Sequence, residues 1–344
     1  MKVKKLAVSV LIISAMCYLC ICFDEVSLCV QNTLLLCCTN IIPALFPFFV
    51  LSDILMANLN SDNLPLWIKL IYRKIFNMPE STLPVFISGL VSGYPVGASL
   101  TYNMYHSGNI TKACAERLIS ITNNPGPMFV ISVVGTGMFG SLRSGIVLYI
   151  IHIISVFVTS LISRDKYIKA KDIQTAHTAK YSIARIIEDD FMKAVKICGF
   201  VTIFAILNNG LCEIIGTKVG AVISCITEIT SGIAQTAKLF PESIAMPLAS
   251  FSLAFSGICV SLQVRSVTKY ELGIKKYFKI KLLNGAISAT LCTIYMKYFS
   301  QKASMENFHS SDMLINGLMI CTYIMIGIYF ITKSGNKNKK IKGL

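Results

Sequence analysis

The stretch that decides the fold is Ser88-Gly-Leu-Val-Ser-Gly-Tyr-Pro-Val-Gly97, which places helix breakers inside an apolar segment, 83–105. In hydrocarbon each unsatisfied backbone group costs several kcal/mol, so a broken helix persists only inside protein or beside a water-filled cavity. The stretch therefore predicts a broken intramembrane segment that is buried within a larger membrane protein.

The composition of the whole chain supports this class. The protein has 344 residues, of which 54% are hydrophobic and only 14% are charged. A soluble domain has about 25% charged residues, because its surface faces water. Several apolar runs also approach the length of about 20 residues that a membrane-spanning helix needs. These two features argue against the alternative, a soluble helical protein with a very apolar core.

The apolar runs predict an all-α integral membrane protein with about eight transmembrane helices. Two further segments, 83–105 and 213–237, are expected to be broken or re-entrant. The expected crossings are residues 6–23, 28–57, 128–142, 145–163, 191–211, 243–263, 282–299 and 312–331. The N-terminus also resembles a signal peptide, but it lacks a small-x-small cleavage site, so we interpret it as a retained first helix.

The order of these segments predicts two similar halves. Each half has a crossing, a broken segment and two further crossings; the first half begins by entering the cell at residue 28, and the second begins by leaving it at residue 191. This is the inverted-topology repeat of many secondary transporters. The expected units are an N-terminal membrane helix (1–27), a first membrane repeat (28–163), a cytoplasmic loop (164–190), a second membrane repeat (191–331) and a basic cytoplasmic tail (332–344).

The positive charge indicates orientation. The net charge is +15, but most of the 32 Lys and Arg residues lie in clusters that border apolar runs. The clusters are residues 2–5, 69–74, 164–196, 265–281 and 333–342. Cytoplasmic loops of membrane proteins carry such clusters. We therefore expect both termini in the cytoplasm, contact with the lipid bilayer and no nucleic-acid partner. An amphipathic stretch, 67–76, is expected to lie along the cytoplasmic membrane surface, with Trp67 as an anchor.

Motifs for catalysis or cofactor binding are absent from the sequence. Most of the 13 cysteines lie in apolar runs, where cysteine acts as a small hydrophobic residue. No HExxH zinc pattern and no Walker A loop occurs. We therefore expect no metal, no cofactor, no catalytic residues and no ATP bound to this chain, which is interpreted as a non-enzyme.

Two Gly/Pro breaks in the first half are the leading candidates for solute binding. Glycines allow close approach of the backbone, and Pro95 suits the first turn of a half-helix whose free N–H groups attract an anion. The run Asn123-Asn-Pro-Gly-Pro127 provides a second such start. The alternative is that these glycines only permit tight helix packing.

Glu228 is the leading candidate in the second half, because it is the one acid in an otherwise uncharged run, 219–237. Acids at such depth mark an ion path, a proton relay or a partner. The alternative is an acid paired with Lys238 or Lys218. The complete set of predicted binding residues is Ser92, Gly93, Tyr94, Pro95, Asn123, Asn124, Gly126, Glu228, Ser231, Gly232, Ser256, Gly257 and Gln263.

Four motifs resemble a known family. They are Pro43-Ala-Leu-Phe-Pro-Phe-Phe-Val-Leu-Ser-Asp53, Ser88 to Ala98, Glu116-Arg-Leu with Asn123-Asn-Pro-Gly-Pro127, and Ser256-Gly-Ile-Cys-Val-Ser-Leu-Gln263. Across residues 28–263 the chain resembles the sporulation integral membrane proteins of the YlbJ type, in the nucleoside-recognition (Gate) superfamily, which is related to concentrative nucleoside transporters. The family's glycine run before the second-half Gln is Phe255-Ser256-Gly257 here.

The resemblance implies a multi-pass protein of the bacterial cell membrane, in the membrane around the developing forespore. It implies transport of a small anionic metabolite such as dipicolinate. The alternative function is a non-transporting membrane scaffold that binds a partner protein during spore formation. The sequence leaves open the coupling ion, the direction of transport and whether the chain forms a homo-oligomer.

Overall fold

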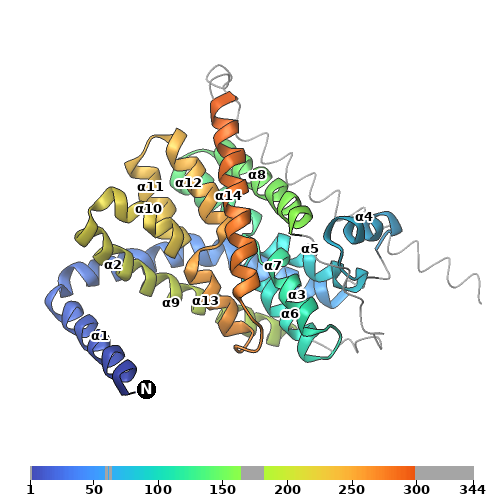
Figure 1. Cartoon of the computed structure of the whole chain (residues 1–344), viewed down its shortest axis with the longest axis horizontal. Coiled ribbons are helices and arrows are strands. Elements are labelled where there is room, and N and C mark those ends of the chain that lie inside the picture. The colour runs from blue at the N-terminus through green and yellow to red at the C-terminus, as the bar shows by residue number, and fades with distance from the viewer. Residues whose placement is uncertain (1, 59–60, 62–63, 164–181, 299–344) are drawn as a thin grey trace, which may run out of the picture.

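The computed structural model describes residues 2–58, 61, 64–163 and 182–298. Within these ranges every regular element is a helix and no strand occurs, so the prediction of an all-helical protein is confirmed for this part of the chain. Figure 1 shows the helices gathered into one body, with α1 projecting from one side.

The first half contains short and broken helices. Its elements are α1 (Lys2–Ile21), α2 (Phe23–Leu36), the π-helical turn η1 (Cys37–Ile41), α3 (Ile42–Asn58), α4 (Leu66–Phe76), the 3₁₀ turn η3 (Glu80–Thr82), α5 (Leu83–Ser92), α6 (Val96–His106), α7 (Lys112–Thr122), the π-helix η4 (Phe129–Met138) and α8 (Leu142–Ile162). The breaks after α5 and α7 fall at the Gly/Pro motifs, as the sequence predicts.

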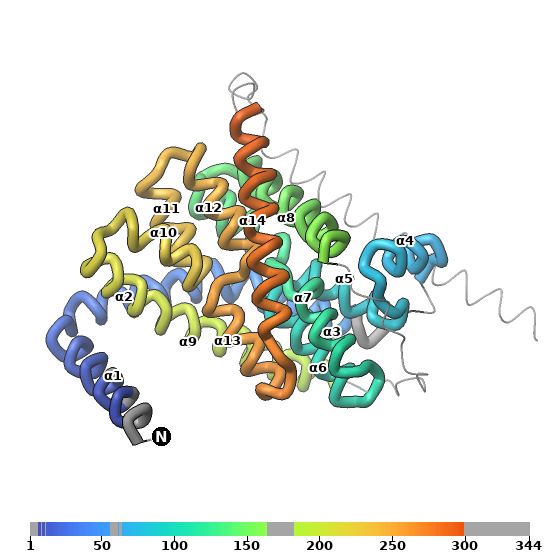
Figure 2. The backbone as a smooth tube through the Cα atoms, in the orientation of Figure 1, coloured from blue at the N-terminus to red at the C-terminus, as the bar shows by residue number. Residues whose placement is uncertain are grey.

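The second half also contains helices that end and restart within a few residues. Its elements are α9 (Ile183–Ile215), α10 (Thr217–Thr227), α11 (Ile229–Leu239), α12 (Glu242–Phe255), α13 (Gly257–Val267) and α14 (Lys275–Tyr298). In the view of Figure 2, α10, α11 and α12 lie on one side of α14, and α5 and α7 lie on the other.

Two prolines lie within continuous helical backbone. A proline commonly kinks or ends a helix, but Pro47 lies inside α3, and helical backbone continues from α2 to α3. The wider π-helical turn of η1 ends at Ile41, two residues before Pro43. A π-turn accommodates an extra residue, so the proline ring and its missing N–H do not end the helix.

Helix α4 agrees with the predicted amphipathic stretch. It buries Tyr72 and Phe76, which are four residues apart and so share one face, whereas Trp67 is 64% exposed. The rings of these two residues pack against Phe86 of α5. The exposed Trp67 is available for the predicted role as a membrane-surface anchor.

Charged residues extend two helices beyond the apolar runs that predicted them. Helix α9 begins at Ile183, inside the expected loop 164–190, and α14 begins at Lys275, inside the expected basic loop 265–281. In α9 the extra turns bury Ile186 and Asp190, one helical turn apart. An apolar run alone therefore underestimates a helix whose first turns are charged.

Within the described part, four helical stretches are long and apolar enough to cross a membrane by length and composition. They are Phe23–Leu55, Leu142–Ile162, Ile183–Ile215 and Glu242–Val267. The predicted crossing at 128–142 corresponds to the shorter η4, and the predicted crossing at 312–331 lies outside the described residues. The count of eight crossings and the inverted repeat stay predictions.

The distribution of polar side chains is that of a membrane protein. Large apolar side chains are exposed, for example Ile13 at 60% and Leu207 at 58%, whereas Arg117 and Lys281 are each only 1% exposed. Lipid accepts apolar side chains and excludes charged ones, so ionisable groups face the interior and find partners there.

One interior ion cluster joins the two halves. The ammonium of Lys193 in α9 donates to Asp53 of α3 over 3.0 Å and to Asp190 over 2.6 Å. Asp190 is fully buried. A single lysine thus connects a helix of the first half to the first helix of the second half.

Candidate solute site between the two halves

The break between α5 and α6 depends on Gly93. This residue has φ of 87°, a left-handed conformation that favours glycine. A Cβ atom at this position would lie 2.5 Å from the backbone nitrogen of Gly126. The two Gly/Pro breaks of the first half are therefore in direct backbone contact, and α6 begins at Val96, directly after Pro95.

The two asparagines of the second break bind α14. The Asn123 side-chain amide donates to the Tyr277 hydroxyl over 2.9 Å, and the Lys281 ammonium donates to Asn124 Oδ1 over 3.0 Å. Asn124 Nδ2 donates to the carbonyl of Ile121 over 2.7 Å. Both asparagines are fully buried. They therefore link the end of α7 to α14.

Glu228 forms the break between α10 and α11. Its backbone is extended, with φ −146° and ψ 128°, and its carboxylate accepts from the N–H of Thr230 over 2.8 Å and of Ser231 over 2.6 Å. Glu228 is 3% exposed. An acid at a helix N-terminus satisfies otherwise unpaired N–H groups and complements the helix dipole. Among the described residues, neither Lys218 nor Lys238 forms an ion pair with it.

The break between α12 and α13 lies at Ser256, a non-glycine residue with φ of 72°. The following Gly257 lies against the carbonyl of Thr227, at 3.2 Å from the position of an added Cβ. Ser252 also donates to the carbonyl of Cys225 over 2.8 Å. The two breaks of the second half thus contact each other, as the two breaks of the first half do.

A small cavity lies where the halves meet. Its volume is about 30 Å³, and its walls come from both halves. It is lined by Ile41, Leu45, Tyr94, Gly126, Phe129, Ile197, Val201, Glu228, Ile229, Thr230, Val260 and Gln263. Two of the lining residues carry an unpaired polar atom: the Tyr94 hydroxyl and Gln263 Oε1 have no hydrogen-bond partner in the described part of the protein.

Four predicted binding residues line this cavity: Tyr94, Gly126, Glu228 and Gln263. The other nine lie around it in the packing between helices. Ser92 donates to Ser52, Gly93 contacts Gly126, Pro95 precedes α6, Asn123 and Asn124 bind α14, Ser231 accepts from Asn208, Gly232 packs on Cys225, Ser256 separates α12 from α13, and Gly257 contacts Thr227.

Two kinds of site residue are not evident from the sequence. The apolar wall includes Ile197 and Val201, which lie one helical turn apart on α9 and look like ordinary core positions in the sequence. Lys281 was assigned to a cytoplasmic loop because it belongs to a basic cluster, yet it is buried beside Asn124. The one sequence signal for Lys281 was its position at the start of an apolar run.

Most residues that line the cavity are apolar, and Glu228 is the charged residue among them. The amino ends of η4 and α11 border the cavity through Phe129 and Ile229. Free N–H groups at a helix start attract anions, and Glu228 already occupies those of α11. The volume accommodates a few water molecules but no metabolite, since ligand pockets are typically about 300–1,000 Å³.

The chain is similar to the sporulation integral membrane protein YlbJ of Bacillus subtilis (strain 168), with 26% identity over an alignment 367 residues long. The alignment covers 86% of this chain and 89% of that protein. The chain is a YlbJ-type relative. The similarity to YlbJ covers most of both proteins, so it confirms the resemblance found in the sequence motifs. No protein-family model and no solved structure matches the chain, and the link to the wider nucleoside-recognition superfamily stays a prediction.

Proposed function

We propose that this protein is a membrane carrier that moves a small anionic metabolite during spore formation, with dipicolinate as the leading candidate cargo. The observation that carries the proposal is the cavity that residues of both halves line, with Glu228 at the break between α10 and α11. Transporters place substrates at such junctions of discontinuous helices. The YlbJ relative supports the association with sporulation.

The small volume of the cavity fits a carrier in a closed conformation. A carrier exposes its site to one side of the membrane and then to the other, and it passes through states in which the site is closed to both. Loading a metabolite therefore requires the walls from α3 and η4 to separate from those of α9 and α13.

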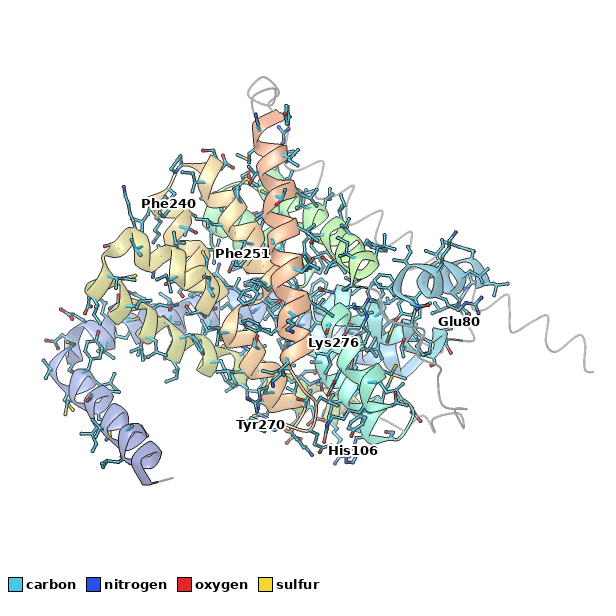
Figure 3. The ribbon with its side chains drawn as sticks, in the orientation of Figure 1. Glu80, His106, Phe240, Phe251, Tyr270 and Lys276 are labelled. Atoms are coloured by element: carbon cyan, nitrogen blue, oxygen red, sulfur yellow. The ribbon has the colours of Figure 1, made fainter. Side chains whose placement is uncertain are left out.

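Contacts at the ends of the helices support the proposal that certain loops lie on the same side of the membrane. The Tyr102 hydroxyl donates to Glu271 over 2.8 Å, so the α6–α7 tip and the loop before α14 lie together. Ser144 donates to Glu242 over 3.0 Å at the other end. Figure 3 shows His106 and Tyr270 at one end and Phe240 toward the opposite end. We propose that the end with Tyr270 is cytoplasmic, as its basic residues predict.

The carboxylate of Glu228 constrains how an anion is carried. Two negative charges in a site of low dielectric repel each other strongly. An anionic cargo therefore needs compensating positive charge, and Glu228 is the position where we expect a proton or cation to bind with it.

Flux through the purified protein tests the proposal. Liposomes containing the full chain are expected to take up labelled dipicolinate, and protein-free liposomes prepared in parallel are the control. Binding of dipicolinate without flux would support the scaffold alternative. Absence of both binding and flux would remove dipicolinate as the cargo.

A further inference from the structure

Helix α14 carries a buried polar face that the cavity does not include. Tyr277, Lys281, Asn284 and Ser288 follow one another at helical spacing, and each is at most 2% exposed. Residues three and four apart lie on the same side of a helix. This face contacts α7, α8 and α12, so it runs through the interior of the molecule.

Hydrogen bonds to neighbouring helices satisfy most of the polar face. Asn284 accepts from Thr159 over 3.0 Å and donates to the carbonyl of Ala254 over 3.2 Å. Ser288 and Ser250 are joined by a hydroxyl contact of 2.8 Å. These neutral groups are paired as a stable interior requires.

Lys281 is the exception on this face. Its ammonium has three N–H donors, and its one hydrogen bond in the described structure is to Asn124 Oδ1. No carboxylate of the described residues lies within ion-pair distance of it. A buried charge without a counter-charge is strongly unfavourable. The carboxyl end of α7, beside Asn124, stabilises a cation by much less than the cost of removing it from water.

His152 is a second buried group without partners, and it lies on α8, which packs against α14. It is 1% exposed, and both of its ring nitrogens lack a partner in the described part of the protein. A neutral imidazole offers one N–H donor, so His152 and Lys281 present unused donors on facing helices.

We infer that Lys281, with Asn124 beside it, forms an anion subsite that binds a carboxylate or similar oxyanion group of the solute. The inference rests on the proposed function and deepens it, because it names the group that neutralises the cargo. An oxyanion supplies the negative charge that Lys281 lacks and accepts the unused N–H donors. Asn124 belongs to the same short break as Gly126, which lines the cavity, so the subsite adjoins the cavity along the chain.

Thermal unfolding of the purified full-length protein tests the subsite. The probes are dipicolinate, benzoate and phosphate, with the uncharged pyridine-2,6-dicarboxamide as a control of similar shape. At least one anion should raise the melting temperature of the unmodified protein, and the diamide should not. Lys281→Met should weaken binding of that anion at least 10-fold. Lys281→Arg should retain binding, and so should Lys279→Met, a change at an exposed lysine of the same helix.

A second variant covers the case in which Lys281→Met does not fold. Asn124→Asp places a carboxylate beside Lys281 and supplies the missing counter-charge within the protein. It exchanges the hydrogen bond from Asn124 Nδ2 to the Ile121 carbonyl for an ion pair with Lys281, so it should fold and lose the anion-induced shift. If none of the anions stabilises the unmodified protein, or if Lys281→Met and Asn124→Asp bind anions normally, the inference is wrong.

The same variants separate this inference from the proposed function. Normal dipicolinate flux and affinity in Lys281→Met would overturn the subsite and leave the carrier intact. Lysine-dependent binding in a protein without flux would support the subsite and overturn the carrier.

Discussion

The two halves of this protein break their helices by different chemistry. In the first half the break uses backbone freedom: Gly93 has φ of 87° and is followed by Tyr94 and Pro95. In the second half the break between α10 and α11 occurs at Glu228, whose backbone is extended and whose side chain caps the next helix. The two breaks share no residue type.

The two breaks are expected to differ in how they respond to charge. The conformation at Gly93 depends on steric space and does not change with charge. The conformation at Glu228 depends on a carboxylate that accepts two backbone hydrogen bonds, and so on the electrostatic state of the cavity. We therefore expect the first break to act as a scaffold and the second to respond to the solute.

The largest effect is expected for Gly93→Ala. The new methyl group would meet the backbone of Gly126 at 2.5 Å, and the residue would retain a left-handed conformation. We expect a loss of about 2–4 kcal/mol in unfolding free energy, from conformational strain and overpacking together. Denaturant unfolding in detergent measures it.

The matched control for this change is Gly108→Ala. Gly108 also has a positive φ, 75°, but no atom lies within 4 Å of an added Cβ. It should lose only about 1 kcal/mol. Equal losses in the two variants would show that the contact between the first-half breaks contributes nothing.

Removing the cap at Glu228 should have a smaller effect on stability. Glu228→Ala leaves the N–H groups of Thr230 and Ser231 without their acceptor, a loss of about 2 kcal/mol. Glu228→Gln keeps one acceptor oxygen and should lose about half of that. Dipicolinate flux per folded protein should fall in both variants, because both remove the ionisable group.

Thr111→Ala provides the reference for an ordinary cap, since Thr111 accepts from the N–H of Cys114 at the start of α7. It should lose about 1 kcal/mol with normal flux. If Glu228→Gln kept full flux, Glu228 would be a structural cap, and the contrast between the halves would be one of folding alone.

The smallest effect is expected for Ser256→Gly, which makes the second half resemble the first. Ser256 has φ of 72° without being glycine. Glycine relieves the left-handed strain but has more freedom in the unfolded state, so we expect a gain below about 1 kcal/mol. A clear loss of stability would mean that the Ser256 side chain contributes more than its backbone strain costs.

The sequence predicted the first-half breaks better than the second-half ones for a physical reason. Glycine frees the backbone and proline restricts it wherever they occur. The residue types at 93–95 and 123–127 therefore locate these two breaks in the sequence. Glu228 was found because of its charge, but its capping role was not, since a cap depends on which helix follows. Ser256 was marked by the neighbouring glycine and the family motif.

Contacts between residues far apart in the chain could not be predicted from the sequence. Lys281 and Asn124 are 157 residues apart, and nothing near either residue indicates that they meet. The same holds for the cavity wall, where Ile41 and Ile197 come from different halves. Helical spacing shows which residues share a face, but it does not show which face another helix covers.

The ion cluster of Lys193 has a consequence for the biosynthesis of the protein. Asp53 and its cation Lys193 are separated by 140 residues. At about 5–20 residues per second, a ribosome needs about 7–28 seconds to synthesise that interval. During this time Asp53, near the end of an apolar helix, lacks its lysine. The carboxylate of Asp53 gains its counter-charge only when α9 emerges from the ribosome. The ion cluster between the two halves can therefore form only after α9 has been synthesised.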